Sequence, residues 1–458
     1  RAAPTLLIAA AVAPLALAPP VHAGADAAAA VAPSFAPSFA IEHYRLDNGL
    51  EVILHRDPLV TTCVVHVWYH VGSKDEVAGR TGFAHLFEHL MFEGSRHVPE
   101  GQFDQLLEAA GGWNNGSTDT DRTNYYEQLP ASSLALALWL EADRMAGLWD
   151  AMSQDVLDNQ RDVVKNERRQ SYENQPYGRA QLEVDAALWP EGHPYHHPTI
   201  GSMADLSAAT LDDVEAFWRT WYRPSNATLV IAGGIDLDAT RALVARYFGW
   251  MPRQDRPAGV TLDGPVTPRP GAVALQTTDQ VQAPKVIVAW RTDAPYTEAA
   301  TNLEVAAQLL GGGKTSRLYR RLVFEDRLAS EVYAFQSDAL LGGSLEIHAI
   351  ARDGVTIEQV RDAIYEEVAR LRDDGVAADE LERATRVLEA SRLGGLENLA
   401  SRAEAIAEWA ADTGDPDHLA EEQALLHAVT PTTLARVLPT WLADDAAVTI
   451  LVRPEVAP

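Results

Sequence analysis

A proline-rich stretch divides the chain into two parts that resemble each other in their pattern of strands and helices. It runs from residue 251 to residue 271 and contains Pro252, Pro257, Pro265, Pro268 and Pro270. Proline has no amide hydrogen to donate, so such a stretch cannot form a helix or a central strand. We therefore predict a linker at residues 251–271, between a first domain at residues 41–250 and a second repeat domain at residues 272–458.

Each part opens with short runs of apolar or alternating residues, which predict strands, and continues into segments with helical periodicity. Strands are expected in the first part near residues 44–54, 62–71 and 227–233, with a helix at 238–248. In the second part, strands are expected near 272–277, 285–291 and 447–452, with helices at 297–310 and 357–373. Hairpin-like strands beside grouped helices favour an α+β fold of two homologous repeats, each a mainly antiparallel sheet packed with helices.

The beginning of the chain has the pattern of a secretory signal. Arg1 precedes a short apolar run that ends at Val21-His22-Ala23, so we predict a signal peptide at residues 1–23. The run is short and contains prolines, which disfavours a transmembrane anchor. Residues 24–40 are rich in alanine, proline and serine and predict a flexible leader. We expect a periplasmic or secreted protein.

The net charge limits the possible binding partners, and the cysteine content excludes an internal disulfide. The chain has 65 acidic and 37 basic residues, a formal net charge of −28. Such a chain is repelled by nucleic acid and by anionic membrane surfaces, so we expect neither partner and no stable membrane anchor. The single cysteine, Cys63, excludes an internal disulfide, and its alternating apolar neighbours favour a thiol buried in the core.

A short motif indicates metal chemistry. Residues 81–93 read TGFAHLFEHLMFE and place His85, Glu88 and His89 in an apolar, helix-permitting run. Residues four apart share one face of a helix, so both imidazoles can bind one metal ion, while Glu88 lies beside that face and can hold a water. A surface helix with two histidines is the alternative. We favour the metal site, because burying three such side chains without a partner is costly.

The third ligand is expected on a different element. Between residues 155 and 172, Glu167 shares the apolar stripe of a predicted helix, so its carboxylate should point inward and need a cation. Glu173 is a neighbouring candidate, but it precedes Asn174-Gln175-Pro176, where a loop is expected. We therefore predict Glu167 as the ligand.

With these residues the chain resembles the inverzincin metallopeptidases, the group of pitrilysin, insulin-degrading enzyme and mitochondrial processing peptidase. The likeness rests on the His85-x-x-Glu88-His89 motif, on the position of Glu167, and on residues 111–126, which resemble the family's strand beside bound substrate. The resemblance implies that His85, His89 and Glu167 bind zinc, with no further cofactor. It also implies that Glu88 is the general base and that Asn115 holds the substrate backbone.

Two departures from the family pattern affect the expected site and assembly. Gln160 stands where relatives often have a glutamate, so it could hydrogen-bond near Glu167 but cannot supply charge. Many relatives also carry an arginine and a tyrosine, seven residues apart, that stabilise the transition state. Val323 and Ser330 occupy those positions here, and the nearby Arg327 and Tyr333 are six apart.

The second departure predicts a partner. Family enzymes close two double-domain halves around the substrate, and this chain is long enough for one half. We expect a heterodimer with a related subunit that supplies the arginine and tyrosine, with a homodimer as the alternative.

The predicted function is a zinc-dependent endopeptidase acting on peptides or unfolded segments. The alternatives are a non-catalytic scaffold and a peptide-binding or chaperone subunit of the same fold. Three ligands and a neighbouring base leave one coordination position for water, which favours the enzyme over a structural zinc site.

Overall fold

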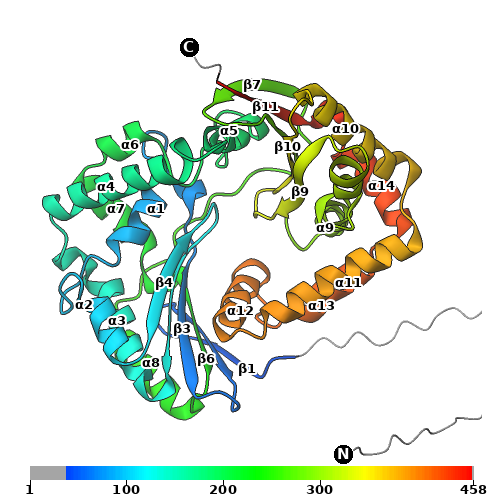
Figure 1. Cartoon of the computed structure of the whole chain (residues 1–458). Coiled ribbons are helices and arrows are strands. Elements are labelled where there is room, and N and C mark those ends of the chain that lie inside the picture. Colours follow the sequence, from blue (N-terminus) through cyan, green and yellow to red (C-terminus); the bar gives the residue numbers. More distant parts are fainter. Residues whose placement is uncertain (1–37, 456–458) are drawn as a thin grey trace, which may run out of the picture. The chain divides into compact units, whose positions relative to one another are not determined.

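Two mixed sheets with the same strand order carry the fold (Figure 1). The structure is a computed structural model that describes residues 38–455. The first sheet has the order β1-β2-β6-β3-β5-β4. Its strands are β1 (Ile41–Arg45), β2 (Glu51–Arg56), β3 (Thr62–Tyr69), β4 (Trp113–Thr118), β5 (Thr123–Pro130) and β6 (Ala227–Gly233). The second sheet has the order β7-β11-β8-β10-β9. Its strands are β7 (Val273–Asp279), β8 (Lys285–Arg291), β9 (Ala329–Ser337), β10 (Ser344–Ala351) and β11 (Val448–Pro454).

The pairing pattern shows that the two sheets are repeats of one unit. In each sheet one pair is parallel, β2 with β6 and β7 with β11. The next three pairs are antiparallel in both sheets, β6-β3-β5-β4 in the first and β11-β8-β10-β9 in the second. Strand β1 is an addition to the first sheet. The predicted α+β fold of two homologous repeats is confirmed.

Helices fill the connections between the strands. The first part contains α1 (Phe83–Leu90), α2 (Gln102–Ala109), α3 (Leu134–Gly147), α4 (Gln154–Arg168), α5 (Gly178–Leu188), α6 (Met203–Ala208), α7 (Leu211–Trp221) and α8 (Leu237–Phe248). The second part contains α9 (Glu298–Gly311), α10 (Ile357–Asp374), α11 (Ala378–Gly395), α12 (Leu399–Thr413), α13 (Leu419–His427) and α14 (Pro431–Trp441). The proline-rich stretch between α8 and β7 contains neither helix nor strand.

The two repeats exchange helices, and this exchange was not predicted. On the first sheet, side chains of β2, β3 and β6 form an apolar cluster with α12, including Trp68 and Val230 against Ile406. On the second sheet, Val184 of α5 lies in a cluster with Ile450 of β11. Figure 1 shows α12 beside β3 and β6, and α5 beside β11. One face of each sheet is therefore covered by a helix from the other half of the sequence.

Two further expectations can be compared with the described residues. Cys63 is buried in β3, as predicted for a core thiol. The predicted signal peptide and most of the predicted leader lie outside the described residues, but the end of the leader is packed, because Phe39 stacks on Trp409. Within residues 38–455, each helix is too short or too polar to cross a membrane.

Candidate metal centre

Helix α1 is fixed at both its first turn and its apolar face. Gly82 precedes the helix with a φ of 90°, a left-handed conformation that favours glycine. The buried carboxylate of Glu76 accepts hydrogen bonds from the amides of Gly82 (2.9 Å) and Ala84 (2.8 Å), so it caps the helix. The buried side chains of the helix include Phe83, Leu86, Phe87 and Leu90. This anchoring sets the direction in which the histidines point.

The structure brings together the three predicted ligands. His85 and His89 stand side by side on α1, with ring centroids 4.9 Å apart. Glu167 of α4 reaches both, with Oε1 3.5 Å from Nε2 of His85 and Oε2 3.2 Å from Nε2 of His89. One ligand atom from each of the three residues lies within 4.8 Å of the other two.

These distances fit a zinc ion. Zinc binds nitrogen and carboxylate oxygen at about 2.0–2.2 Å in tetrahedral geometry, which separates neighbouring ligand atoms by about 3.3–3.5 Å. The separations of 3.2 and 3.5 Å between an imidazole nitrogen and a carboxylate oxygen are close to that spacing, and each involves a different oxygen of Glu167. Two imidazoles and one carboxylate are also a donor set that zinc accepts in catalytic sites. His85, His89 and Glu167 could therefore hold zinc.

The protonation states of the cluster also suit a metal ion. Burial lowers the pKa of His85, which favours the neutral imidazole that can donate its lone pair. The hydrogen bond with His89 lowers the pKa of Glu167, against the opposing effect of burial, so this carboxyl group is ionised at neutral pH.

Glu88 lies beside the ligand cluster and is held by strand β4. Its Oε2 accepts a 2.6 Å hydrogen bond from the hydroxyl of Thr118, the last residue of that strand. Gly116 permits the close approach, because a Cβ there would lie 3.3 Å from Cγ of Glu88. Sequence reasoning missed Thr118. Its position two residues after Gly116, on the same face of the strand, was the available signal.

The remaining predicted residues lie near the cluster in different ways. Asn115 is exposed on β4, the edge strand of the first sheet, and its side-chain oxygen accepts from the amide of Gly116 at 2.9 Å. Gln160 is buried on α4 and hydrogen-bonds to Glu93, whose pKa is raised mainly by burial. Gln160 thus has a hydrogen-bond partner in Glu93.

The loop predicted at Asn174-Gln175-Pro176 is present, but it begins only after Glu173. This residue ends a π-helical turn, Arg169–Glu173, that continues α4, and its carboxylate lies 3.7 Å from the guanidinium of Arg168. Helical hydrogen bonding therefore persists past the end of the apolar stripe on which the sequence prediction relied. Glu167 remains the acid that faces the histidines.

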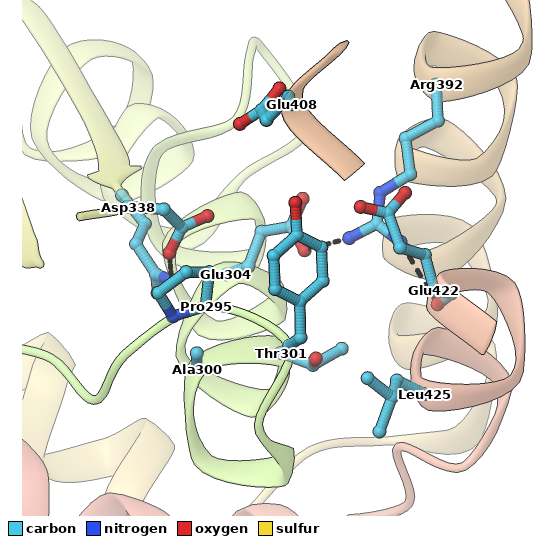
Figure 2. Close-up of a pocket in the computed structure, with 11 residues that line it drawn as sticks. Pro295, Ala300, Thr301, Glu304, Asp338, Arg392, Glu408, Glu422 and Leu425 are labelled. Atoms are coloured by element: carbon cyan, nitrogen blue, oxygen red, sulfur yellow. Dashed lines mark hydrogen bonds and ion pairs between the residues drawn. The ribbon is translucent and has the colours of Figure 1, made fainter. Parts of the chain in front are cut away.

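Acidic side chains also gather at two other places in residues 38–455. Asp415, His418 and Glu421 also cluster, but Asp415 and Glu421 are exposed. A cavity of about 80 Å³ lies between α9, α11 and the two helices that follow, with Glu304, Glu408 and Glu422 at its wall. Figure 2 shows Arg392 beside Glu422, bonded to Glu304 and to the Glu422 carbonyl.

Comparisons with known proteins agree with the fold. The family described as insulinase (peptidase family M16) matches residues 51–198, and the family described as peptidase M16 inactive domain matches residues 208–388. The zinc protease PqqE of Helicobacter pylori is 27% identical over 415 residues, 90% of this chain and 93% of that protein. An uncharacterized zinc protease of Mycobacterium tuberculosis is 31% identical over 393 residues, which cover 84% of this chain and 84% of that protein.

Solved protease structures have the same fold. The crystal structure of a protease from Helicobacter pylori superposes with a TM-score of 0.85 at 27% identity, covering 91% of this chain and 100% of that one. The fold also recurs in the periplasmic protease PqqL from Escherichia coli, with a TM-score of 0.75 at 19% identity. The superposed region spans 91% of this chain and 48% of the PqqL chain.

The doubled α+β fold is that of a solved protease, and the relatives in sequence are named zinc proteases. The chain is a member of peptidase family M16, the insulinase family. The resemblance to pitrilysin and insulin-degrading enzyme inferred from the motif is thereby confirmed.

Proposed function

We propose that the chain is a zinc-dependent endopeptidase that hydrolyses peptides or unfolded segments, with His85, His89 and Glu167 as the zinc ligands and Glu88 as the general base. The observation that carries the proposal is the cluster of two imidazoles and one carboxylate, with ligand atoms within 4.8 Å of one another and a second carboxylate held beside them by Thr118. The named zinc proteases among the relatives support the same reaction.

Each side chain has a distinct part in hydrolysis. A zinc ion supplies a Lewis acid that polarises the scissile carbonyl and acidifies water. Glu88 accepts the proton of the attacking water through the carboxylate oxygens and returns it to the leaving amine. The Thr118 hydroxyl donates to Oε2 of Glu88 and so fixes the direction of the carboxylate. Glu76 holds the helix that carries both histidines and the base.

Substrate is proposed to bind along the exposed edge of the first sheet. Strand β4 pairs with β5 on one side and with no other strand of the described sheet on the other, so its backbone is available to an extended peptide. Asn115 is exposed in the middle of this strand and would hold the substrate backbone. An unfolded peptide can adopt the extended conformation that this addition requires, whereas a folded domain cannot.

The active assembly is proposed to contain two subunits. Val323 packs against the core of the second repeat, and the hydroxyl of Ser330 donates to the carbonyl of Ile350 at 3.3 Å. Neither side chain can provide the arginine and tyrosine interactions found in many relatives. Tyr333 is engaged in stacking on His348, with ring centroids 5.0 Å apart. A related subunit would supply the missing pair, and a homodimer is the alternative. The proposed location is the periplasm or the exterior.

A non-catalytic role as a scaffold or peptide-binding subunit is the second candidate. The match to a family described as an inactive domain favours it for residues 208–388, which include none of the four proposed metal and base residues. Those residues all lie within the match to the insulinase family at residues 51–198.

Cleavage of an unstructured fluorogenic peptide by the zinc-loaded full chain tests the proposal. The Glu88→Gln variant should keep its zinc and lose cleavage by at least about 10³-fold, because it lacks a base. Glu108→Gln, an exposed residue on α2, makes the same charge change and should remain active. Zinc loss from Glu88→Gln would show that Glu88 is a ligand. Zinc binding without cleavage in the wild type, alone or with a related subunit, would favour the non-catalytic candidate.

A further inference from the structure

A cavity lined by both aromatic side chains and arginines lies beside the packing that supports helix α1. Its volume is about 370 Å³, and its walls come from the ends of α3 and α7 and from the start of the proline-rich stretch. Trp218, Tyr222, Met145, Trp250 and Met251 provide the apolar surface. Trp250 is 59% exposed, an unusual exposure for so large an apolar side chain.

The charges around this cavity are opposite in sign to those of the chain as a whole. Arg96, Arg219 and Arg223 line it, and none of the lining residues is acidic, although the chain carries a net charge of −28. Arg96 is paired with Asp150 and Arg219 with Glu215. Arg223 differs, because its guanidinium donates to the backbone carbonyls of Asp255 (3.2 Å) and Arg219, and no carboxylate of residues 38–455 pairs with it.

The positive charge of Arg223 is therefore without a carboxylate partner in the described part of the chain. A guanidinium fork matches a carboxylate or sulfonate. An anionic group on a ligand would supply the missing counter-charge.

The size and walls of the cavity indicate the rest of the ligand. Small-molecule sites commonly enclose about 300–1,000 Å³, with apolar and aromatic walls and a few fixed polar groups. We propose that this cavity binds a small organic anion with an apolar body, whose anionic group contacts Arg223 while its body lies between Trp218 and Trp250. The acid-lined cavity in Figure 2 has the opposite charge and would exclude such a ligand.

The site is separate from the metal centre but shares a wall with its support. The ring of Tyr222 stacks on Phe87 of α1 with centroids 4.9 Å apart. The hydroxyl of Tyr125 donates to the Phe87 carbonyl at 3.1 Å and lies 3.4 Å from the hydroxyl of Tyr222. A ligand against Tyr222 therefore adds to the packing behind the metal helix and should raise the melting temperature by mass action.

Titration calorimetry of the zinc-loaded full chain with decanoate tests the proposal. We expect saturable binding of one decanoate per chain, and binding at least about 10-fold weaker for decanol, which has the same apolar body without the charge. Arg223→Gln should weaken decanoate binding at least about 10-fold, because one charge-assisted pair is lost. Arg246→Gln removes the same charge from an exposed position on α8, and this variant should bind decanoate normally.

Two further variants keep the test decisive. Met145→Trp would fill the cavity and should abolish binding without a change of charge, which covers the case that Arg223→Gln folds poorly. His85→Ala should bind decanoate as the wild type does, because the site does not include the metal centre. The proposal is overturned if decanoate and decanol bind alike, if Arg223→Gln and Met145→Trp both bind normally, or if His85→Ala abolishes binding. A shift to dimers on addition of decanoate, without binding of one ligand per chain, would also overturn it.

Discussion

The two repeats place equivalent helices beside equivalent strands and give them different chemistry. Helix α1 lies between β3 and β4 in the chain, and α9 lies between β8 and β9, the corresponding strands of the second sheet. The first helix carries His85, Glu88 and His89, whereas the second is filled with buried apolar and small side chains such as Leu303 and Ala307. The shared fold therefore fixes the position of the helix, and a few side chains decide whether that position can hold a metal.

The surroundings of the two helices differ as well. Behind α1, the buried Arg144 pairs with Glu127 and Glu141 and lies over the ring of Tyr125 at 4.5 Å. The corresponding core of the second repeat is built from aliphatic side chains around Trp290. Buried ion pairs cost desolvation and give little net stability, so this network is better explained by the need to hold one arrangement near the site.

The largest expected effect comes from removing the proposed carboxylate ligand, Glu167, of the first repeat. Glu167→Ala should lower zinc affinity by more than about 100-fold and abolish peptide cleavage, because two imidazoles alone leave the ion weakly held. Zinc content after dialysis measures it. Glu173→Ala, six positions further on, is the matched control and should keep its zinc. Normal zinc in Glu167→Ala together with loss in Glu173→Ala would transfer the ligand role.

The exchange of helices predicts that the repeats cannot be separated at the proline-rich stretch. Expressed alone, residues 38–260 would lack α12 and residues 261–455 would lack α5, so each fragment would expose an apolar sheet face. We expect neither fragment to show cooperative thermal unfolding, and the two fragments expressed together to restore it. Cleaving the intact chain at an inserted protease site after residue 260 should leave the halves associated. Independent cooperative unfolding of either fragment would show that the exchange is dispensable.

The sequence predicted much of this arrangement because its signals were local. The proline-rich stretch, strands such as β3 and β6, and helices such as α9 and α10 follow from periodicity and proline chemistry, and the His85–His89 spacing follows from the helical repeat. The cap that Glu76 provides is local, but it depends on a loop conformation that periodicity does not give. The pairing of Arg144 with Glu127 could not be predicted in this way, because it joins a helix to a strand of the sheet. The helix exchange escaped for the same reason, since an apolar helix face does not specify which sheet it covers. The ligand and base roles themselves stay predictions.

A smaller effect should follow from changing how Glu88 is held. Thr118→Val keeps the branched shape required in β4 but removes the hydroxyl that donates to Glu88. We expect kcat to fall about 10-fold, the loss associated with one hydrogen bond to a charged group, with zinc content unchanged. Thr118→Ser retains a hydroxyl and should recover most of the rate. Equal losses in the valine and serine variants would mean that the strand's packing matters and that the hydroxyl does not.

The smallest expected effect concerns the acidic cavity that only the second repeat helps to form (Figure 2). Desolvation and the carboxylates of Asp412 and Glu422 raise the pKa of Glu408 from 4.5 to about 8. Below pH 4.5 the side chain is protonated in both folded and unfolded states. Between pH 4.5 and 8 the unfolded chain ionises while the folded chain retains the proton, so stability falls as the pH rises through this window.

Glu408→Gln should remove this pH-dependent loss of folding stability, because glutamine does not ionise. Relative to the wild type, the variant should melt at nearly the same temperature at pH 5 and about 1–2 °C higher at pH 8. The shift is small because Glu408 is only partly desolvated: part of its side chain is exposed, and solvent there screens the charge. Glu397→Gln, exposed shortly before α12, is the matched control. A melting difference that is equal at both pH values would mean that packing, and not the charge of Glu408, separates the variant from the wild type. The acids of the second repeat would then be no more than a solvated surface, and the contrast with the first repeat would rest on the metal helix alone.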